Sequence, residues 1–346
     1  MNASIRLFAL AALIPIPLLS LGALFGGLWV WGALGYMTLL AFSLDQLASV
    51  ASNPEAPDAE FPAANRLSVI LALGHFAVLI LAILGLSGRM PLGFGERFAL
   101  FMGAGLFFGQ ISNSNAHELI HRGNRALHRL GMWVYISLLF GHHTSAHPLV
   151  HHRYVASPQD PNSARPGESY YRFAPRAWIG SFRAGYRAEK ARLARVERSA
   201  WWQNPYALYI GGAAGIALLV FAATGPAGLL AYIALAAYAQ MQLLLSDYVQ
   251  HYGLNRAEIG GKLEPVGPQH SWNARQWFTS LMMLNAPRHS DHHAHPTTPY
   301  PNLILPQGAP MLPRSLPAMA TLALFPSLWR RVMDPRAKAI RARQTP

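Results

Sequence analysis

The chain has 346 residues, of which 52% are hydrophobic and only 12% are charged, whereas an average soluble domain carries about 25% charged residues. Several apolar runs approach or reach the roughly 20 residues that cross a bilayer, so the composition indicates an integral membrane protein. The formal charge of +13 comes from Lys and Arg gathered at 122–198 and 314–343, beside apolar runs, which argues against nucleic acid as a partner. The lack of cysteine excludes thiolate zinc sites and Cys-ligated iron–sulfur clusters, so we expect electrons to come from another protein.

The apolar runs predict an all-α integral membrane protein that forms a single domain over residues 1–346. The six predicted transmembrane helices cover about 5–26, 28–47, 67–87, 97–115, 206–223 and 226–245. The last two are separated by a turn at Gly225-Pro226. Residues 116–205 and 246–346 are predicted to form a histidine-rich cap that holds two metal ions.

The distribution of charge predicts the orientation of the chain. If the N-terminus is inside, six crossings place 116–205 and 246–346 on the cytoplasmic side, together with most of the basic residues. This is the distribution that the positive-inside rule expects. We therefore predict a multi-pass protein of the inner, cytoplasmic membrane, with its active site on the cytoplasmic side.

Three segments of the chain carry histidines at spacings that suit one helical face. Residues at i, i+3 and i+4 of a helix share a face, and related spacings occur in all three segments. A further histidine stands at the inner end of the sixth span. The nine predicted metal ligands are His117, His121, His147, His151, His152, His251, His289, His292 and His293.

Nine imidazoles are more than one metal ion uses, and they suit two metals with positions left open for a reactant. Imidazole binds several transition metals, so the ligand type alone does not choose among them. A membrane-buried site with lipid-soluble reactants favours redox chemistry and hence iron. The other histidines lie outside these spacings; we interpret His75 as a hydrogen-bonded core residue and leave His128, His142, His143, His270 and His295 out of the ligand set.

Three acids stand close in sequence to the predicted ligands. We predict that Glu118, Asp160 and Asp291 contact the metal-ligating histidines without binding the metal, and so orient the imidazoles and tune their basicity. A helix cap or a salt bridge to a nearby arginine is the alternative for Glu118 and Asp160.

Four motifs carry a resemblance to a known family. They are His117-Glu-Leu-Ile-His121-Arg, His147-x3-His151-His152-x2-Val-Ala-Ser-Pro-x-Asp-Pro, Asp247-Tyr-Val-Gln-His251-Tyr-Gly-Leu and Arg288-His-Ser-Asp-His-His-Ala-His-Pro. In this order they resemble the membrane-bound alkane 1-monooxygenase family, with xylene monooxygenase as a relative and fatty acid desaturases and hydroxylases further away. The resemblance implies a non-haem di-iron centre held by the nine histidines, O2 as co-substrate, and a rubredoxin or ferredoxin-type electron donor with its reductase.

The chain departs from the family pattern beside the ligands. Ala146 and Val150 replace the usual Glu and Gly of the second motif, Gln250 replaces a Glu, and Pro287 precedes Arg288 where Leu-Gln is typical. The ligands are all retained. The departures therefore leave the substrate class open, whereas the prediction of the metal site stands.

The function that we predict is O2-dependent hydroxylation of the terminal methyl of an apolar hydrocarbon that enters from the bilayer. Bulky residues of the spans, Trp29, Trp31, Phe107 and Phe108, are candidates to limit the substrate channel, with lipid-facing or packing roles as the alternative. A fatty acyl desaturase or lipid hydroxylase with the same iron centre is the nearest alternative function, and a metal transporter is one of a different class.

Overall fold

Long apolar helices dominate the computed structural model, which describes residues 3–47, 62–196 and 200–344. Four helices in the described residues are long and apolar enough to cross a membrane: Ile5–Phe25, Gly27–Leu47, Pro62–Leu86 and Pro205–His251. The chain is therefore a multi-pass membrane protein, as its composition predicts.

The first two of these helices form a hairpin, each with a local break. The first consists of α1 (Ala3–Leu13) and α2 (Pro15–Phe25), and the second of α3 (Gly27–Gly35), the π-helix η1 (Tyr36–Leu40) and α4 (Ala41–Leu47). Gly26 joins them with a φ of 62°, a conformation that costs glycine little. The Glu96 carboxylate accepts a hydrogen bond of 2.6 Å from Gly27 N and so ties the hairpin to a later helix. The third helix, α5 (Pro62–Leu86), packs on α2.

The predicted fourth span lies within a continuous helical run at 94–120. It consists of α6 (Phe94–Leu106), the π-helix η2 (Phe107–Ser112) and α7 (Asn113–Ile120). The predicted span 97–115 is helical, but it is not one of the four long apolar helices. Its second half carries polar residues such as Gln110, and these lie inside a bundle with α3, α5 and α12.

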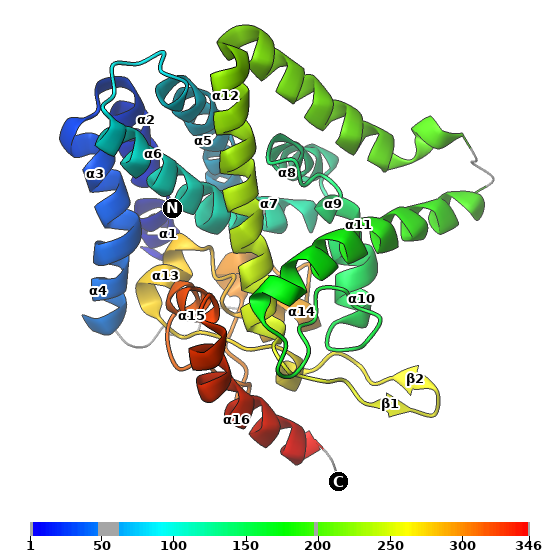
Figure 1. Ribbon diagram of the computed structural model, residues 1–346. Helices are drawn as coiled ribbons and strands as arrows, with labels where there is room; N and C mark the ends of the chain where they lie inside the picture. The colour runs from blue at the N-terminus through cyan, green and yellow to red at the C-terminus, as the bar shows by residue number, and fades with distance from the viewer. Residues whose placement is uncertain (1–2, 48–61, 197–199, 345–346) are drawn as a thin grey trace.

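The longest helix, α12 (Pro205–His251), is two helices joined at a sharp turn. Gly225 has φ 71° and ψ −166°, which lies outside the helical region, and Pro226 starts the second half. Figure 1 shows the halves folding back on each other at the top of the view. The predicted Gly225-Pro226 turn is thus confirmed, and the second half carries the chain down to His251.

The remaining elements lie between α7 and α12 and after α12, and most of them are short. The helical ones are α8 (Arg125–Ser137), α9 (His143–Ala146), the π-helix η3 (His147–His151), α10 (His152–Tyr154), α11 (Tyr170–Ala194), η4 (Trp201–Gln203), η5 (Pro268–His270), α13 (Trp277–Met282), α14 (His289–Ala294), η6 (Tyr300–Asn302), α15 (Leu316–Ala323) and α16 (Pro326–Gln344). The all-α prediction needs one correction, because β1 (Glu258–Ile259) and β2 (Lys262–Leu263) form a small antiparallel hairpin. Gly260 and Gly261, both with positive φ, make its two-residue turn.

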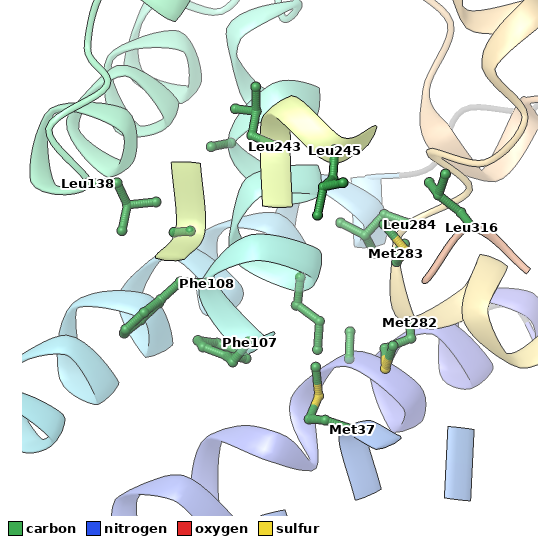
Figure 2. Packing of buried hydrophobic residues seen from close by; sticks show 14 of the residues in the cluster. Met37, Phe107, Phe108, Leu138, Leu243, Leu245, Met282, Met283, Leu284 and Leu316 are labelled. Atoms are coloured by element: carbon green, nitrogen blue, oxygen red, sulfur yellow. The ribbon is translucent and has the colours of Figure 1, made fainter. Parts of the chain in front are cut away.

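The hydrophobic core is continuous from the membrane helices into the cap. Figure 2 shows Met37 of η1, Leu245 of α12, Met282 of α13 and Leu316 of α15 close together, although they are far apart in sequence. Burial of these side chains fixes the cap on one end of the membrane helices, because each contributes about 1.5–3 kcal/mol when fully removed from water.

We expect Gly225→Ala to lower the stability of the protein by about 1–3 kcal/mol, because alanine is strained at a φ of 71°. Gly215→Ala is the matched control, since this glycine lies in the same helix with open space around its Cβ position. Apparent melting temperatures in detergent measure the difference. Equal melting temperatures for the two variants would contradict the assigned role of Gly225.

Candidate metal centre

Four segments that are distant in sequence bring their histidines to one place beneath the membrane helices. They are α7, the η3–α10 turn, the C-terminal end of α12, and α14, and Figure 1 shows α7, α10 and α14 around the lower part of α12. Nine imidazoles converge there, in two groups within each of which the potential ligand nitrogens lie within 4.8 Å of one another. The first group is His117, His121, His147, His152 and His292, and the second is His151, His251, His289 and His293.

The ring nitrogens of the first group point at a common centre. His147 Nε2 lies 2.7 Å from His117 Nε2 and 2.9 Å from His152 Nε2. His152 Nε2 is also 3.1 Å from His292 Nε2. The ring of His121 completes the group, with its centroid 4.7 Å from that of His152.

The second group repeats this arrangement beside the first. His289 Nε2 lies 2.9 Å from His251 Nε2 and 3.1 Å from His293 Nε2. The ring of His151 packs edge-on against His251 with 4.7 Å between the ring centroids. Residues of α14 therefore serve both groups, because His292 and His293 follow each other on the helix and belong to different groups.

The π-helical turn η3 explains how the second motif also serves both groups. Because a π-helix bonds residue i to residue i+5, His147 and His152 lie one above the other, and both join the first group. His151 points instead to the second group. From the sequence, the spacing was interpreted as i, i+4 with one additional histidine, since nothing in the sequence distinguishes this turn from an α-helical one.

Hydrogen bonding alone cannot satisfy the first group. A neutral imidazole nitrogen carries either one hydrogen or one lone pair, yet the Nε2 atoms of His147 and His152 each contact two other Nε2 atoms. The buried His121 Nε2 has no hydrogen-bond partner in the described part of the chain. A cation at the centre gives every one of these lone pairs a partner. The nitrogen donor set therefore fits a pair of transition-metal ions.

Burial keeps most of these cap imidazoles neutral, which is the form that binds a metal. Desolvation, with repulsion from neighbouring imidazoles, lowers the pKa of His147, His152, His292 and His293 well below the usual value. His151 is the exception: burial lowers its pKa, but the charge of Asp160 and its hydrogen bond outweigh burial and raise it.

Asp160 is the one of the three predicted acids that contacts a clustered histidine. Its Oδ2 lies 2.8 Å from His151 Nδ1 and also accepts a hydrogen bond from Ser163 Oγ. This places the hydrogen of His151 on Nδ1. Its Nε2, which has no hydrogen-bond partner among the described residues, therefore carries the lone pair. Asp160 Oδ1 accepts from Asn162 N, and Asn162 Nδ2 donates to Asp247 at 2.6 Å.

The other two acids hold the backbone and side chains around the site. Glu118 Oε1 accepts from Tyr300 N at 3.0 Å and forms a salt bridge with Arg122. Asp291 lies 2.9 Å from both His295 Nδ1 and Ile304 N. In the described part of the chain, neither carboxylate has a hydrogen bond to one of the nine histidines. Glu118 has instead the salt bridge to a nearby arginine that was the alternative interpretation.

Sequence reasoning missed Asp247 and His143, which are both buried beside the centre. Asp247 is part of the fourth motif, and its bond to Asn162 links α12 to the Asp160 loop. His143 lies outside both groups, with its ring 4.8 Å from that of His147. His75, as predicted, is a core residue, with Nε2 2.8 Å from Ser137 Oγ.

A cavity of about 300 Å³ runs from the membrane helices toward the histidines. Met37, Leu245 and Met283 contribute to its apolar lining. It shares Asn113 and two serines with a smaller space of about 40 Å³ that His117, His147 and His289 line.

The bulky residues considered as candidates to limit this channel do not line it. Trp29 and Trp31 are 46% and 48% exposed on the second helix, which agrees with the lipid-facing role that was the alternative. Phe107 and Phe108 are fully buried and pack against each other in the core (Figure 2). From these two helical runs the lining comes instead from residues such as Met37, Ala41, Gly109 and Asn113.

Comparison with known proteins identifies the class. Residues 97–321 match the family model for fatty acid desaturases. The chain is 31% identical to alkane 1-monooxygenase 2 of Pseudomonas aeruginosa over 95% of this chain and 90% of that protein. It is 35% identical to alkane 1-monooxygenase 1 of Alcanivorax borkumensis over 76% of this chain and 65% of that protein. Similarity extends to the xylene/toluene monooxygenase hydroxylase component of Pseudomonas putida, at 26% over 89% of this chain and 82% of that protein.

The fold, the histidine centre and the family model together define a membrane enzyme of the fatty acid desaturase type. Within that class, the chain belongs to the alkane 1-monooxygenase family and is a monooxygenase. The resemblance seen in the four motifs is thereby confirmed.

We expect Asp160→Asn to weaken metal binding by about 10- to 100-fold. The amide loses the negative charge beside His151 and has one acceptor oxygen in place of the two that serve His151 Nδ1, Ser163 Oγ and Asn162 N. Asp291→Asn is the matched control, since its carboxylate contacts His295 and Ile304 N and none of the clustered histidines. Competition with a chromophoric chelator measures the affinity. An unchanged affinity in Asp160→Asn would show that the carboxylate does not position the ligand.

Proposed function

We propose that this protein hydroxylates the terminal methyl of an apolar hydrocarbon, using O2 and two iron ions held by the nine histidines. The observation that carries this proposal is that the largely apolar cavity borders a smaller space lined by histidines of both groups, with Asn113, Ser114 and Ser246 in the lining of both. The relatives named alkane 1-monooxygenase support the reaction and the substrate class. A metal carrier would need its ligands along a path through the membrane, whereas these lie together at the inner ends of the helices.

Two iron ions, when bound, would supply the redox chemistry that splits O2 and places one oxygen atom in a C–H bond. The chain's own residues would hold these ions and orient the ligand rings. His117, His121, His147, His152 and His292 would hold one ion, and His151, His251, His289 and His293 the other. Asp160 fixes the ring of His151 through its Nδ1 hydrogen.

The cavity decides which part of the substrate meets the centre. A chain bound along it has one end at Asn113, which borders both the cavity and the space beside His117. Because the cavity borders the histidine-lined space at Asn113, a chain that enters end-on brings a terminal carbon to the histidines first. Holding that carbon beside the centre makes the step effectively unimolecular, which lowers its barrier.

The topology that fits this function has six crossings, with the run at 97–115 as the fourth and the two halves of α12 as the last two. The whole chain then acts as one domain, and the cap lies on the cytoplasmic side of the inner membrane, where most of the basic residues gather. The basic residues of α11 and α16 favour an acidic electron donor of the rubredoxin or ferredoxin type, supplied by its reductase.

The desaturase family match keeps one alternative open: the same centre could remove two hydrogens from a fatty acyl chain. The products separate the two reactions, because hydroxylation gives an alcohol that carries an oxygen atom from O2, and desaturation gives a new double bond.

We expect the iron-loaded protein, supplied with a rubredoxin and its reductase, to convert octane to octan-1-ol with label from ¹⁸O2. His289→Ala should lose this activity, because it removes a nitrogen from the second group. His295→Ala is the matched control from the same motif, since His295 is 67% exposed and bonds Asp291. Gas chromatography with mass detection reads the product. Retained activity in His289→Ala, or a double bond in place of the alcohol, would contradict the proposal.

We expect Ala320→Phe to shift the preferred substrate toward shorter alkanes, because α15 forms one wall of the cavity and a phenyl ring there takes up its space. Ala222→Phe is the control, since Ala222 is exposed on α12 and lies outside the lining. Product yields across a series of linear alkanes measure the shift. Parallel profiles in the two variants would show that this cavity does not hold the substrate.

A further inference from the structure

His143 is a buried imidazole that lies beside the metal centre but belongs to neither group of ligands. It is the first residue of the short helix α9 and is only 4% exposed. The rings of Tyr135, Phe140 and His147 pack on it, with centroids 4.9, 5.5 and 4.8 Å from its own. Packing against three rings holds the imidazole in one orientation, so a hydrogen bond from it has a fixed direction.

The ring of His143 has a hydrogen to donate and no protein group to receive it. An imidazole carries at least one N–H, whether it is neutral or protonated. The neighbouring His142 has Nε2 3.2 Å from Ser181 Oγ, whereas the ring of His143 forms no hydrogen bond in the described part of the chain. A buried N–H that gives up water without gaining another partner is costly, so the space next to the ring decides what this donor binds.

Among the described residues, the ring of His143 lies between two spaces, and they differ in whether they hold a ligand. One is the space of about 40 Å³ that histidines of both groups line. The other lies toward Val150 and Asn162 and has no room even for a water molecule. The N–H of His143 therefore serves a molecule in the first space.

The size of that space selects a very small ligand. A water molecule needs a cavity of about 10–15 Å³. A volume of about 40 Å³ thus admits a molecule of two or three atoms and excludes most of a hydrocarbon chain. Of the two substrates in the function proposed above, O2 is the one that fits here.

The hydroxyl groups in the same lining are already used. Ser114 Oγ donates to a backbone carbonyl at 2.6 Å, and Ser246 Oγ donates to a side-chain amide oxygen at 2.7 Å. The Tyr135 hydroxyl donates to a backbone carbonyl at 3.4 Å. The Asn113 amide, at the border with the substrate cavity, is the donor that competes with His143.

From these observations we propose that His143 is a catalytic residue for the oxygen co-substrate, and that its N–H donates a hydrogen bond to the small molecule held beside both imidazole groups. The assignment of O2 as that molecule rests on the function proposed above. O2 accepts hydrogen bonds weakly, but its oxygen atoms become strong acceptors as electrons reach them. A donor that is already fixed in direction stabilises this charge without reorganisation. His143 keeps its hydrogen throughout and takes no part in the bond changes.

Azide tests the donor without turnover, because it is a three-atom anion that accepts hydrogen bonds and forms a coloured complex with ferric iron. We expect His143→Phe to weaken azide binding to the iron-loaded, oxidised protein by about 10-fold, the ratio that one hydrogen bond to a charged acceptor gives. The phenyl ring keeps the packing against the neighbouring rings and removes only the N–H. His143→Gln supplies an amide N–H and should recover most of the affinity. Titration by visible absorption measures it.

His142→Phe is the matched control, because it makes the same change in the adjacent residue, whose ring bonds Ser181 and lies outside the lining of the space. It should leave the azide affinity unchanged, and iron analysis checks that all variants are equally loaded. An unchanged affinity in His143→Phe would overturn the proposal and assign this N–H to water alone. A 10-fold loss in Asn113→Leu with none in His143→Phe would overturn it in favour of the Asn113 amide.

A measurement on the unaltered protein does not depend on any variant folding. After exchange into D2O, the infrared stretching band of bound azide should shift, because deuterium replaces the hydrogen that His143 donates. The same shift should appear in His142→Phe and should be absent in His143→Phe. A band that stays in place in the unaltered protein would contradict the proposed hydrogen bond.

Turnover separates this proposal from the function on which it rests. In octane hydroxylation, His143→Phe should lower kcat/KM for O2 by about 10-fold and leave KM for octane unchanged. Weakened azide binding with an unchanged kcat/KM for O2 would overturn the assignment to O2. Hydroxylation by the unaltered protein, with an azide affinity that does not depend on His143, overturns this proposal and leaves the function standing. Azide binding that depends on His143 in a protein that oxidises no hydrocarbon supports the donor and refutes the proposed function.

Discussion

The structure depends on nine imidazoles whose lone pairs converge where water is excluded. Neutral rings can be buried at modest cost, but lone pairs that face one another at 2.7–3.1 Å need a cation between them. That requirement links α7, η3, α12 and α14, four segments that are separated by up to 176 residues between His117 and His293. The metal centre is thus as much a fold determinant as the hydrophobic core, and metal-loaded and metal-free forms should differ in stability.

The membrane helices and the cap have different roles. The membrane helices shape a cavity for an apolar chain, and the cap holds the ligands, with Asn113 at the border. Polar residues in the run at 94–120 are the sign of this border, since a helix that only crossed lipid would not carry them. They also explain why this run is less apolar than the four long helices that frame the bundle.

The sequence predicted the membrane helices and the set of converging histidines well, because both depend on local patterns. Apolar length marks a span, and the spacing of His289, His292 and His293 marks one face of a helix that the structure confirms. It could not assign the histidines to the two groups. That division depends on the π-turn at His147 and on the angle at which α14 approaches, which are set by tertiary packing.

Long-range geometry also decides where side chains point, which the sequence does not show. Trp29 and Trp31 have the bulk expected of channel residues, but the rotation of their helix turns them outward. Glu118 and Asp291 stand next to histidines in sequence, yet their carboxylates turn to the backbone of Tyr300 and Ile304. Asp247 could have been noticed, because it belongs to the same motif as His251. Only the structure shows its link through Asn162 to the Asp160 loop.

One helical run, 94–120, carries both a wall of the cavity and His117, and His121 follows directly at its end. A change of side-chain volume at Gly109 or Gln110 therefore shifts the backbone that holds His117. The walls formed by η1 and α15 carry no histidine of the centre. Over evolutionary time, new substrate preferences should accumulate on those two walls, while the helix that bears the histidines diverges slowly in every lineage that keeps the chemistry.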